Sequence, residues 1–255
     1  MPWLSRYPLP ARVAPPLTLP QPVTAQQLER YVHNEAELRS AIGEMAAHFS
    51  VDSNAVRTEF GGMIIVAASF TVKAPIDVVT RCTIDGSRGG TIYAGTASLS
   101  SLFVINAELV TLQSLFVRAL NGKFFTSLAE ASGANSWLRI QGCYTETDRL
   151  FVDGAAGGDA AESWFVDNVV ISQSATFSAP IELQSPRCVV RGNVFTHDGG
   201  GDAITLQGGA SDTEVSGNYC SLADITSNGS RNVIMGNRRT GTITRHATDA
   251  EGLNT

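Results

Sequence analysis

The sequence predicts an all-β fold, a parallel β-helix of about seven coils with an N-terminal α-helical cap and an extended proline-rich arm. Three observations predict it: a repeat of about 25 residues, alternating apolar residues within each repeat, and seven of the ten prolines within the first 23 residues. We expect an arm over residues 1–23, a helical cap or neck over 24–58, the β-helix over 59–245 and a polar tail over 246–255.

Composition narrows the function classes. A hydrophobic content of 43% over 255 residues is enough for a core. The net charge of −6 disfavours broad attraction to nucleic acid, so we expect no nucleic-acid partner. No run reaches the roughly 18 apolar residues of a membrane span. The first residues hold no continuous apolar run of a secretory signal, so export by that route is not expected.

A short turn motif anchors the repeat. The "RGN" that ends at Asn193 recurs as "SGN" and "MGN", and the same register extends backward through four earlier positions. The anchors are residues 86, 114, 142, 167, 192, 217 and 236, with steps of 28, 28, 25, 25, 25 and 19 residues. Self-similarity at such a period is the signature of a solenoid.

Side-chain alternation supports the repeat. The residues two before the anchors are all apolar: Ile84, Leu112, Ile140, Phe165, Val190, Val215 and Ile234. The positions on either side of them are mostly polar, which is the pattern of a strand with one buried face. Each repeat is too short for a strand and a crossover helix, and further strand candidates lie in "RLFVDG", "IELQS", "ITLQG" and "DITSNG". Seven coils stacked at about 4.8 Å would form a column of roughly 34 Å.

One column of asparagines follows from the register. Asn168, Asn193, Asn218 and Asn237 occupy the same place in four successive coils. Asparagine tolerates left-handed backbone and bonds to neighbouring backbone groups. We therefore expect a structural ladder of amides along one corner.

The segments "NEAELRSAI", "GGMIIVAASFTV" and "VTRCTIDG" precede the coils in this order. Together with the coils they carry a resemblance to the pectate-lyase-like, right-handed parallel β-helix superfamily, which covers about Asn34 to Arg245. It implies a right-handed coil whose open end is covered by a short helix. It does not fix the function, because this fold hosts lyases, hydrolases, binders and spikes.

The segments before the coils carry their own signals. Asn34 and Glu37 form a capping box, and Leu38, Ala41, Ile42 and Met45 make an apolar stripe. An earlier box, "TAQQ" from Thr24, predicts another short helix. The arm interleaves prolines with large apolar side chains, so we interpret it as a particle anchor rather than a loose tail. The anchor residues are Trp3, Leu4, Tyr7, Leu9 and Leu17.

The four cysteines lie far apart, without a C-x-x-C pair or neighbouring histidine, so we expect buried thiols and no metal or other cofactor. Apolar residues at outward positions could line a contact between subunits, and a homotrimer is expected. These residues are Trp164, Val166, Val189, Val233 and Met235.

Two sets of residues are candidates for function. For catalysis, polysaccharide cleavage needs paired carboxylates, and Asp198, Asp202 and Glu182 are the weak candidates, with His197 beside them. Three glycines between Asp198 and Asp202 favour a solvent-exposed turn there rather than a catalytic pair. For carbohydrate binding, planar aromatic and amide groups are required, and the candidates are Trp137, Trp164, Tyr144, Tyr219, Gln184 and Gln207. The tyrosines could equally be packing residues.

The leading hypothesis is a spike or fibre of a virion or virus-like particle, of the phage or gene-transfer-agent type. Its arm would attach to a capsid or tail protein, and its coils would bind host cell-surface polysaccharide during adsorption. The alternatives are a polysaccharide depolymerase, either lyase or glycoside hydrolase, on the same fold, and a purely structural connector.

Overall fold

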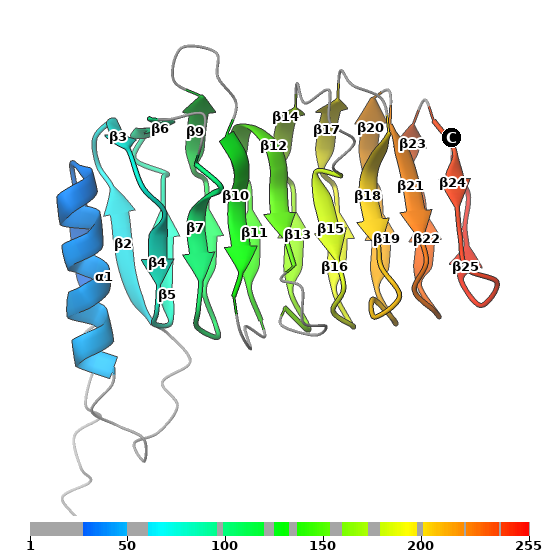
Figure 1. The fold of residues 1–255 in the computed structure, drawn as a ribbon, viewed down its shortest axis with the longest axis horizontal. Coiled ribbons are helices and arrows are strands. Elements are labelled where there is room, and N and C mark those ends of the chain that lie inside the picture. Colours follow the sequence, from blue (N-terminus) through cyan, green and yellow to red (C-terminus); the bar gives the residue numbers. More distant parts are fainter. Residues whose placement is uncertain are drawn as a thin grey trace, which may run out of the picture.

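The computed structural model confirms an all-β parallel β-helix with one helix at its N-terminal end (Figure 1). It describes residues 28–49, 61–95, 99–119, 125–132, 137–153, 160–172, 179–197, 201–221, 223–239 and 241–254. All strand pairs in these ranges are parallel, and the coils stack side by side from α1 at one end to β25 at the other. The handedness that the resemblance implies stays a prediction.

Three strand columns form the faces of the solenoid, and we call them sheets A, B and C. Among the described residues, sheet A contains ten strands: β1 (Glu29–Val32), β2 (Gly62–Val66), β5 (Cys82–Asp85), β8 (Thr111–Gln113), β11 (Arg139–Gln141), β13 (Trp164–Val166), β16 (Val189–Arg191), β19 (Glu214–Ser216), β22 (Val233–Met235) and β25 (Ala250–Glu251). The seven anchors follow seven of these strands, β5 to β22. The described part of sheet A therefore has ten strands rather than seven, because β1 and β2 precede the seven anchored strands and β25 follows them.

Sheets B and C complete each coil. Sheet B contains β3 (Phe70–Val72), β6 (Thr91–Ala94), β9 (Phe116–Ala119), β14 (Val169–Ser172), β17 (Val194–His197), β20 (Tyr219–Ser221) and β23 (Arg238–Arg239). Sheet C contains β4 (Ile76–Val78), β7 (Ser101–Ile105), β10 (Phe125–Ala131), β15 (Ile181–Leu183), β18 (Asp202–Leu206), β21 (Asp224–Ser227) and β24 (Ile243–Thr244). The long strand β12 (Tyr144–Val152) pairs in sheet B at its start and in sheet C at its end, and so joins the two.

The predicted register holds along sheet A. Ile84 pairs with Leu112, Leu112 with Ile140, and the same column continues to Ile234 through strand after strand. Every member of this column is fully buried. The four additional strand candidates in the sequence lie on β12, β15, β18 and β21, all in sheet C.

The anchors recur because the six sheet-A strands from β8 to β22 are each followed by a left-handed residue. Ser114, Gly142, Asp167, Gly192, Gly217 and Gly236 all have φ between 51° and 67°. Glycine adopts this conformation at little cost, which is why "GN" is the commonest form of the motif.

An asparagine follows each of the last four anchors; it is buried, and its side chain bonds to the next coil. The Asn168 Nδ2 donates to Asn193 Oδ1 at 2.9 Å, Asn193 Nδ2 to Asn218 Oδ1 at 2.9 Å, and Asn218 Nδ2 to Asn237 Oδ1 at 2.9 Å. Each amide also donates to a backbone carbonyl, such as that of Ile140 from Asn168. Asn254 accepts from Asn237 and adds a fifth member to the ladder.

The helix α1 (Glu35–Phe49) covers the N-terminal end of the coils (Figure 1). Its capping residue Asn34 accepts the Glu37 N–H at 2.9 Å, and Glu37 accepts the His33 N–H at 2.8 Å. Leu38, Ala41, Ile42 and Met45 are buried against the first coil. At the other end β25 pairs with β22, so sheet A continues past Arg245 into the tail.

The four cysteines are buried and free, as the sequence predicts. The largest fully buried side chains include Phe103, Phe151, Phe165 and Phe195. The arm, the segment around Thr24 and residues 50–60 lie outside the described residues.

Candidate functional site

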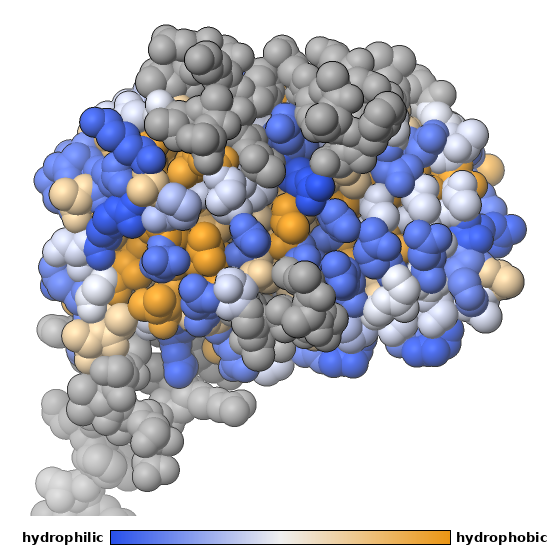
Figure 2. Space-filling view, viewed as in Figure 1, coloured by the Kyte–Doolittle hydropathy of each residue, from blue (hydrophilic) through white to orange (hydrophobic). Residues whose placement is uncertain are grey.

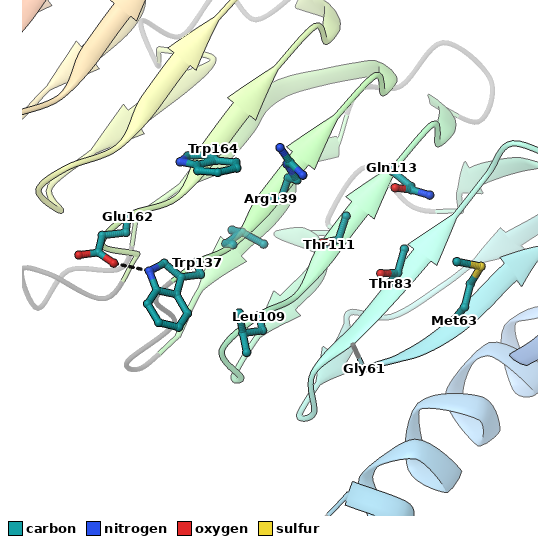
Figure 3. Close-up of a pocket in the computed structure, with 11 residues that line it drawn as sticks. Gly61, Met63, Thr83, Leu109, Thr111, Gln113, Trp137, Arg139, Glu162 and Trp164 are labelled. Atoms are coloured by element: carbon teal, nitrogen blue, oxygen red, sulfur yellow. Dashed lines mark hydrogen bonds between the residues drawn. The ribbon is translucent and has the colours of Figure 1, made fainter. Parts of the chain in front are cut away.

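A hollow of about 420 Å³ lies on the outer surface of sheet A (Figure 3). Outward residues of five consecutive strands form one row along it, because Met63, Thr83, Thr111, Arg139 and Trp164 are paired in register. The complete lining is Gly61, Met63, Thr83, Leu109, Thr111, Gln113, Trp137, Leu138, Arg139, Glu162 and Trp164.

Two tryptophans border one end of the hollow. Trp137 is 45% exposed and Trp164 is 44% exposed, although tryptophan is usually well buried. Trp164 belongs to β13, whereas Trp137 precedes β11 with left-handed backbone, φ 65°. Both indoles therefore offer apolar surface beside polar groups of the same hollow (Figure 3).

Arg139 is next to Trp164 in the row. Its guanidinium carbon is 4.5 Å from the centre of the Trp164 ring, a cation–π contact. Within the described ranges Arg139 has no ion pair, and its Nε is buried without a hydrogen-bond partner. The arginine is thus oriented by an aromatic face rather than by a carboxylate.

Glu162 fixes the orientation of Trp137. The Trp137 Nε1–H donates to Glu162 Oε2, and Arg187 Nε donates to Glu162 Oε1 at 2.8 Å. These bonds, first from Trp137 and then from Arg187, lower the pKa of the Glu162 carboxyl. Both oxygens of this carboxylate are therefore engaged within the protein.

Trp137 and Glu162 belong to a second column of left-handed residues, which we call the edge ladder. Its members stand five residues before the anchors, with φ between 55° and 65°: Leu109, Trp137, Glu162, Arg187, Asp212 and Arg231. Further along, Arg231 Nε and Nη2 donate to Asp212 at 2.8 and 2.7 Å. Sequence reasoning missed this column, although alternating charges at one repeat position were visible signals.

The six residues expected to bind carbohydrate lie on three different faces. Trp137 and Trp164 share the hollow on sheet A. Tyr144 stacks on Phe116 in sheet B with ring centres 4.5 Å apart, and Tyr219 lies in the same sheet beneath Arg238. Gln184 and Gln207 directly follow two adjacent strands of sheet C. The structure therefore brings together the tryptophan pair but not the whole set.

The weak catalytic candidates are not gathered into one site within the described residues. Glu182 is on β15, where Arg149 Nη1 donates to it at 3.1 Å and Gln207 Nε2 at 3.0 Å. Asp202 is at the start of β18 and accepts from Thr205 and Thr226. Glu182 pairs with Thr205, three residues beyond Asp202, so the two Cα atoms are roughly 11 Å apart by strand geometry. Asp198 and the side chain of His197 lie outside the described part of the chain.

The outward apolar residues expected at a subunit contact lie on sheet A. Trp164 and Met235 are exposed, whereas Val166, Val189 and Val233 are half-buried. The face in Figure 2 mixes hydrophobic and hydrophilic residues, with the hydrophobic ones gathered toward the helical end. The anchor residues Trp3, Leu4, Tyr7, Leu9 and Leu17 lie outside the described residues.

The described ranges contain neither a metal-binding cluster nor a helix that could span a membrane. No group of three or more histidine, cysteine, aspartate or glutamate side chains there could hold a metal ion. No described helix is long and apolar enough to cross a membrane. No protein-family model matches the sequence, and no curated protein matches it.

Proposed function

We propose that this protein is a virion-associated spike or fibre whose β-helix binds host cell-surface polysaccharide at the sheet-A hollow. The observation that carries the proposal is the pair of exposed indoles, Trp137 and Trp164, in one hollow with Arg139. Aromatic rings provide apolar surface for the faces of sugar rings, and the guanidinium provides hydrogen-bond donors for their oxygens.

The scaffold under this hollow suits an extended ligand. Successive strands of sheet A are about 4.8 Å apart, so the row from Met63 to Trp164 extends over roughly 19 Å along the solenoid axis. The hydroxyls of Thr83 and Thr111 and the amide of Gln113 line the remainder. Because the backbone is fixed by ladder hydrogen bonds on both sides, these groups need little ordering when a ligand binds.

The proposal is tested by glycan-array binding with matched variants. Wild-type protein should bind a defined group of glycans, and Trp164→Ala should weaken that binding about tenfold or more. The reason is that aromatic side chains covered by a bound ligand supply much of the binding energy. Met235→Ala is the control, since Met235 is 43% exposed on the same sheet but does not line the hollow. Absence of binding to every glycan would contradict binding at this site and favour the purely structural connector. An equal loss of affinity in Trp164→Ala and Met235→Ala would also contradict binding at this site.

Attachment to the particle is assigned to the arm. Its support is the composition of residues 1–23, in which prolines alternate with large apolar side chains, and the resemblance of the coils to spike proteins. Deleting residues 1–23 should leave a folded oligomer that no longer joins its capsid or tail protein. Normal incorporation of the truncated protein would count against the anchor.

A second candidate is a polysaccharide depolymerase acting at sheet C. It is favoured by Glu182, whose carboxylate lies beside Arg149 and Gln207. If this carboxylate acts as an acid or base, Glu182→Gln should abolish the release of fragments, followed by mass spectrometry, while the melting temperature changes little. Fragments formed at the wild-type rate would remove Glu182 from consideration.

A further inference from the structure

Arg139 differs from the arginines of the edge ladder, because those are neutralised within the chain. Arg187 binds Glu162 and Arg231 binds Asp212, each with a shortest separation of 2.7 or 2.8 Å. Arg139 has no such partner among the described residues, and its Nε is a buried donor without an acceptor. An arginine that lines a hollow and lacks a carboxylate is a place where an anion can bind.

The surroundings of Arg139 reinforce this difference. Glu162 is the one acidic residue among those lining the hollow, and its two oxygens are already bound to Trp137 and Arg187. Arg139, Arg187 and Glu162 together therefore carry one excess positive charge, on a protein whose formal net charge is −6. The hollow is therefore locally positive, although the protein as a whole is negative.

Arg139 presents a ligand with the Nη end of its guanidinium, because its Nε is buried. Its guanidinium is stacked over the Trp164 ring at 4.5 Å, which occupies one face of the planar group. The N–H groups of a guanidinium point outward in its plane, and they match the two oxygens of a carboxylate. Stacking also fixes the direction of this fork before a ligand arrives.

From these observations we infer that the hollow selects a saccharide bearing a carboxylate, which Arg139 binds while Trp164 and Trp137 contact the sugar rings. This inference rests on the proposed polysaccharide binding and names its ligand class. The hydroxyls of Thr83 and Thr111, which are in register with Arg139, then face the neighbouring sugar units along the row.

The test uses the full-length protein and a glycan array that holds acidic glycans with their carboxyl-reduced counterparts. The strongest acidic glycan and its reduced form are then titrated by calorimetry against wild type, Arg139→Gln, Arg139→Lys and Arg191→Gln. Arg191 is exposed on β16 of the same sheet and does not line the hollow, so Arg191→Gln removes the same charge elsewhere.

We expect wild type to bind the acidic form at least about tenfold more tightly than the reduced form. Arg139→Gln should abolish this preference, so that the acidic and the reduced form bind within about twofold of each other. Arg139→Lys should retain part of the preference, because lysine keeps the charge without the planar fork. Arg191→Gln should keep it.

Four results would overturn the inference. Equal binding of acidic and reduced forms, or equal losses in Arg139→Gln and Arg191→Gln, would show that Arg139 reads no carboxylate while polysaccharide binding itself stands. Equally tight binding of a sulfated neutral glycan would show that the hollow senses negative charge alone. Absence of any glycan binding would remove the proposed function and this inference with it.

Discussion

At the scale of single residues, the left-handed edge ladder connects backbone geometry with charge. Non-glycine residues with positive φ cost about 1 kcal/mol or more each, and they persist where their surroundings hold them. Glu162 is held by Trp137 and Arg187, and these contacts lower the pKa of its carboxyl. The same orientation holds the Trp137 indole beside Arg139.

Removing either contact should therefore raise the pKa of Glu162. We expect a larger rise in Trp137→Phe than in Arg187→Gln, because the indole hydrogen bond is the leading cause of the shift. Side-chain NMR titration measures it. The pKa of Asp212 is lowered mainly by the hydrogen bond from Arg231 and least by the charge of Arg187, so Arg187→Gln should raise it only slightly. An unchanged Glu162 titration in both variants would contradict the ladder.

The sign of the pH dependence follows from the same shift. Because the pKa of Glu162 is lowered in the folded protein, its contacts stabilise the fold above the ordinary value of 4.5. That contribution is lost as the pH falls below 4.5 and through the folded-state pKa. In urea titrations, Glu162→Gln should therefore lose less stability than wild type between neutral pH and pH 3. If Glu162→Gln lost as much stability as wild type over this pH range, the pH dependence would not come from Glu162.

The buried thiols give a second prediction at this scale. Burial raises the pKa of Cys82, Cys143, Cys188 and Cys220 to about 12, so almost no thiolate forms near neutral pH. Native protein at pH 8 should react with a disulfide reagent only as fast as it unfolds, whereas all four thiols should react at once in guanidinium. Rapid reaction of native protein would place a thiol at the surface.

At the scale of structural elements, the asparagine ladder ties one coil to the next. Asn193 accepts from Asn168 and donates to Phe165 and Asn218, so Asn193→Ala leaves several buried groups without partners. We expect a loss of roughly 3 kcal/mol in urea unfolding. Asn254→Ala, at the partly exposed end of the ladder, should cost about 1 kcal/mol. Equal losses of unfolding free energy in the two variants would mean that burial does not determine how much each ladder residue contributes to stability.

The same elements explain what the sequence could predict. The anchors at Gly142, Gly192 and Gly236 located sheet A because a left-handed corner and a buried asparagine must recur in register. The hollow was only partly predictable. Trp137 and Trp164 were visible as aromatic residues, but Arg139 and Glu162 acquire their roles from contacts between coils 25 residues apart. Such contacts depend on the corner conformations, which side-chain alternation does not reveal.

At the scale of the whole molecule, the stacked coils form one continuous scaffold, and the helix α1 covers its N-terminal end (Figure 1). Apolar residues of sheet A outside the hollow, the exposed Met235 and the half-buried Val189 and Val233, motivate the expected homotrimer. Light scattering coupled to size-exclusion chromatography should give three times the 27.0 kDa mass of the full chain, and three times the smaller mass of the chain that lacks residues 1–23. A monomer at micromolar concentration would contradict that assembly.

The central claim is that polysaccharide binds across the two tryptophans of the sheet-A hollow. Acrylamide quenching of tryptophan fluorescence tests it directly, because two of the three tryptophans line that hollow. A bound glycan should reduce quenching in wild type and leave it unchanged in the double variant Trp137→Phe/Trp164→Phe, in which only Trp3 remains. Binding without any protection of these tryptophans would place the glycan on another face and contradict the claim.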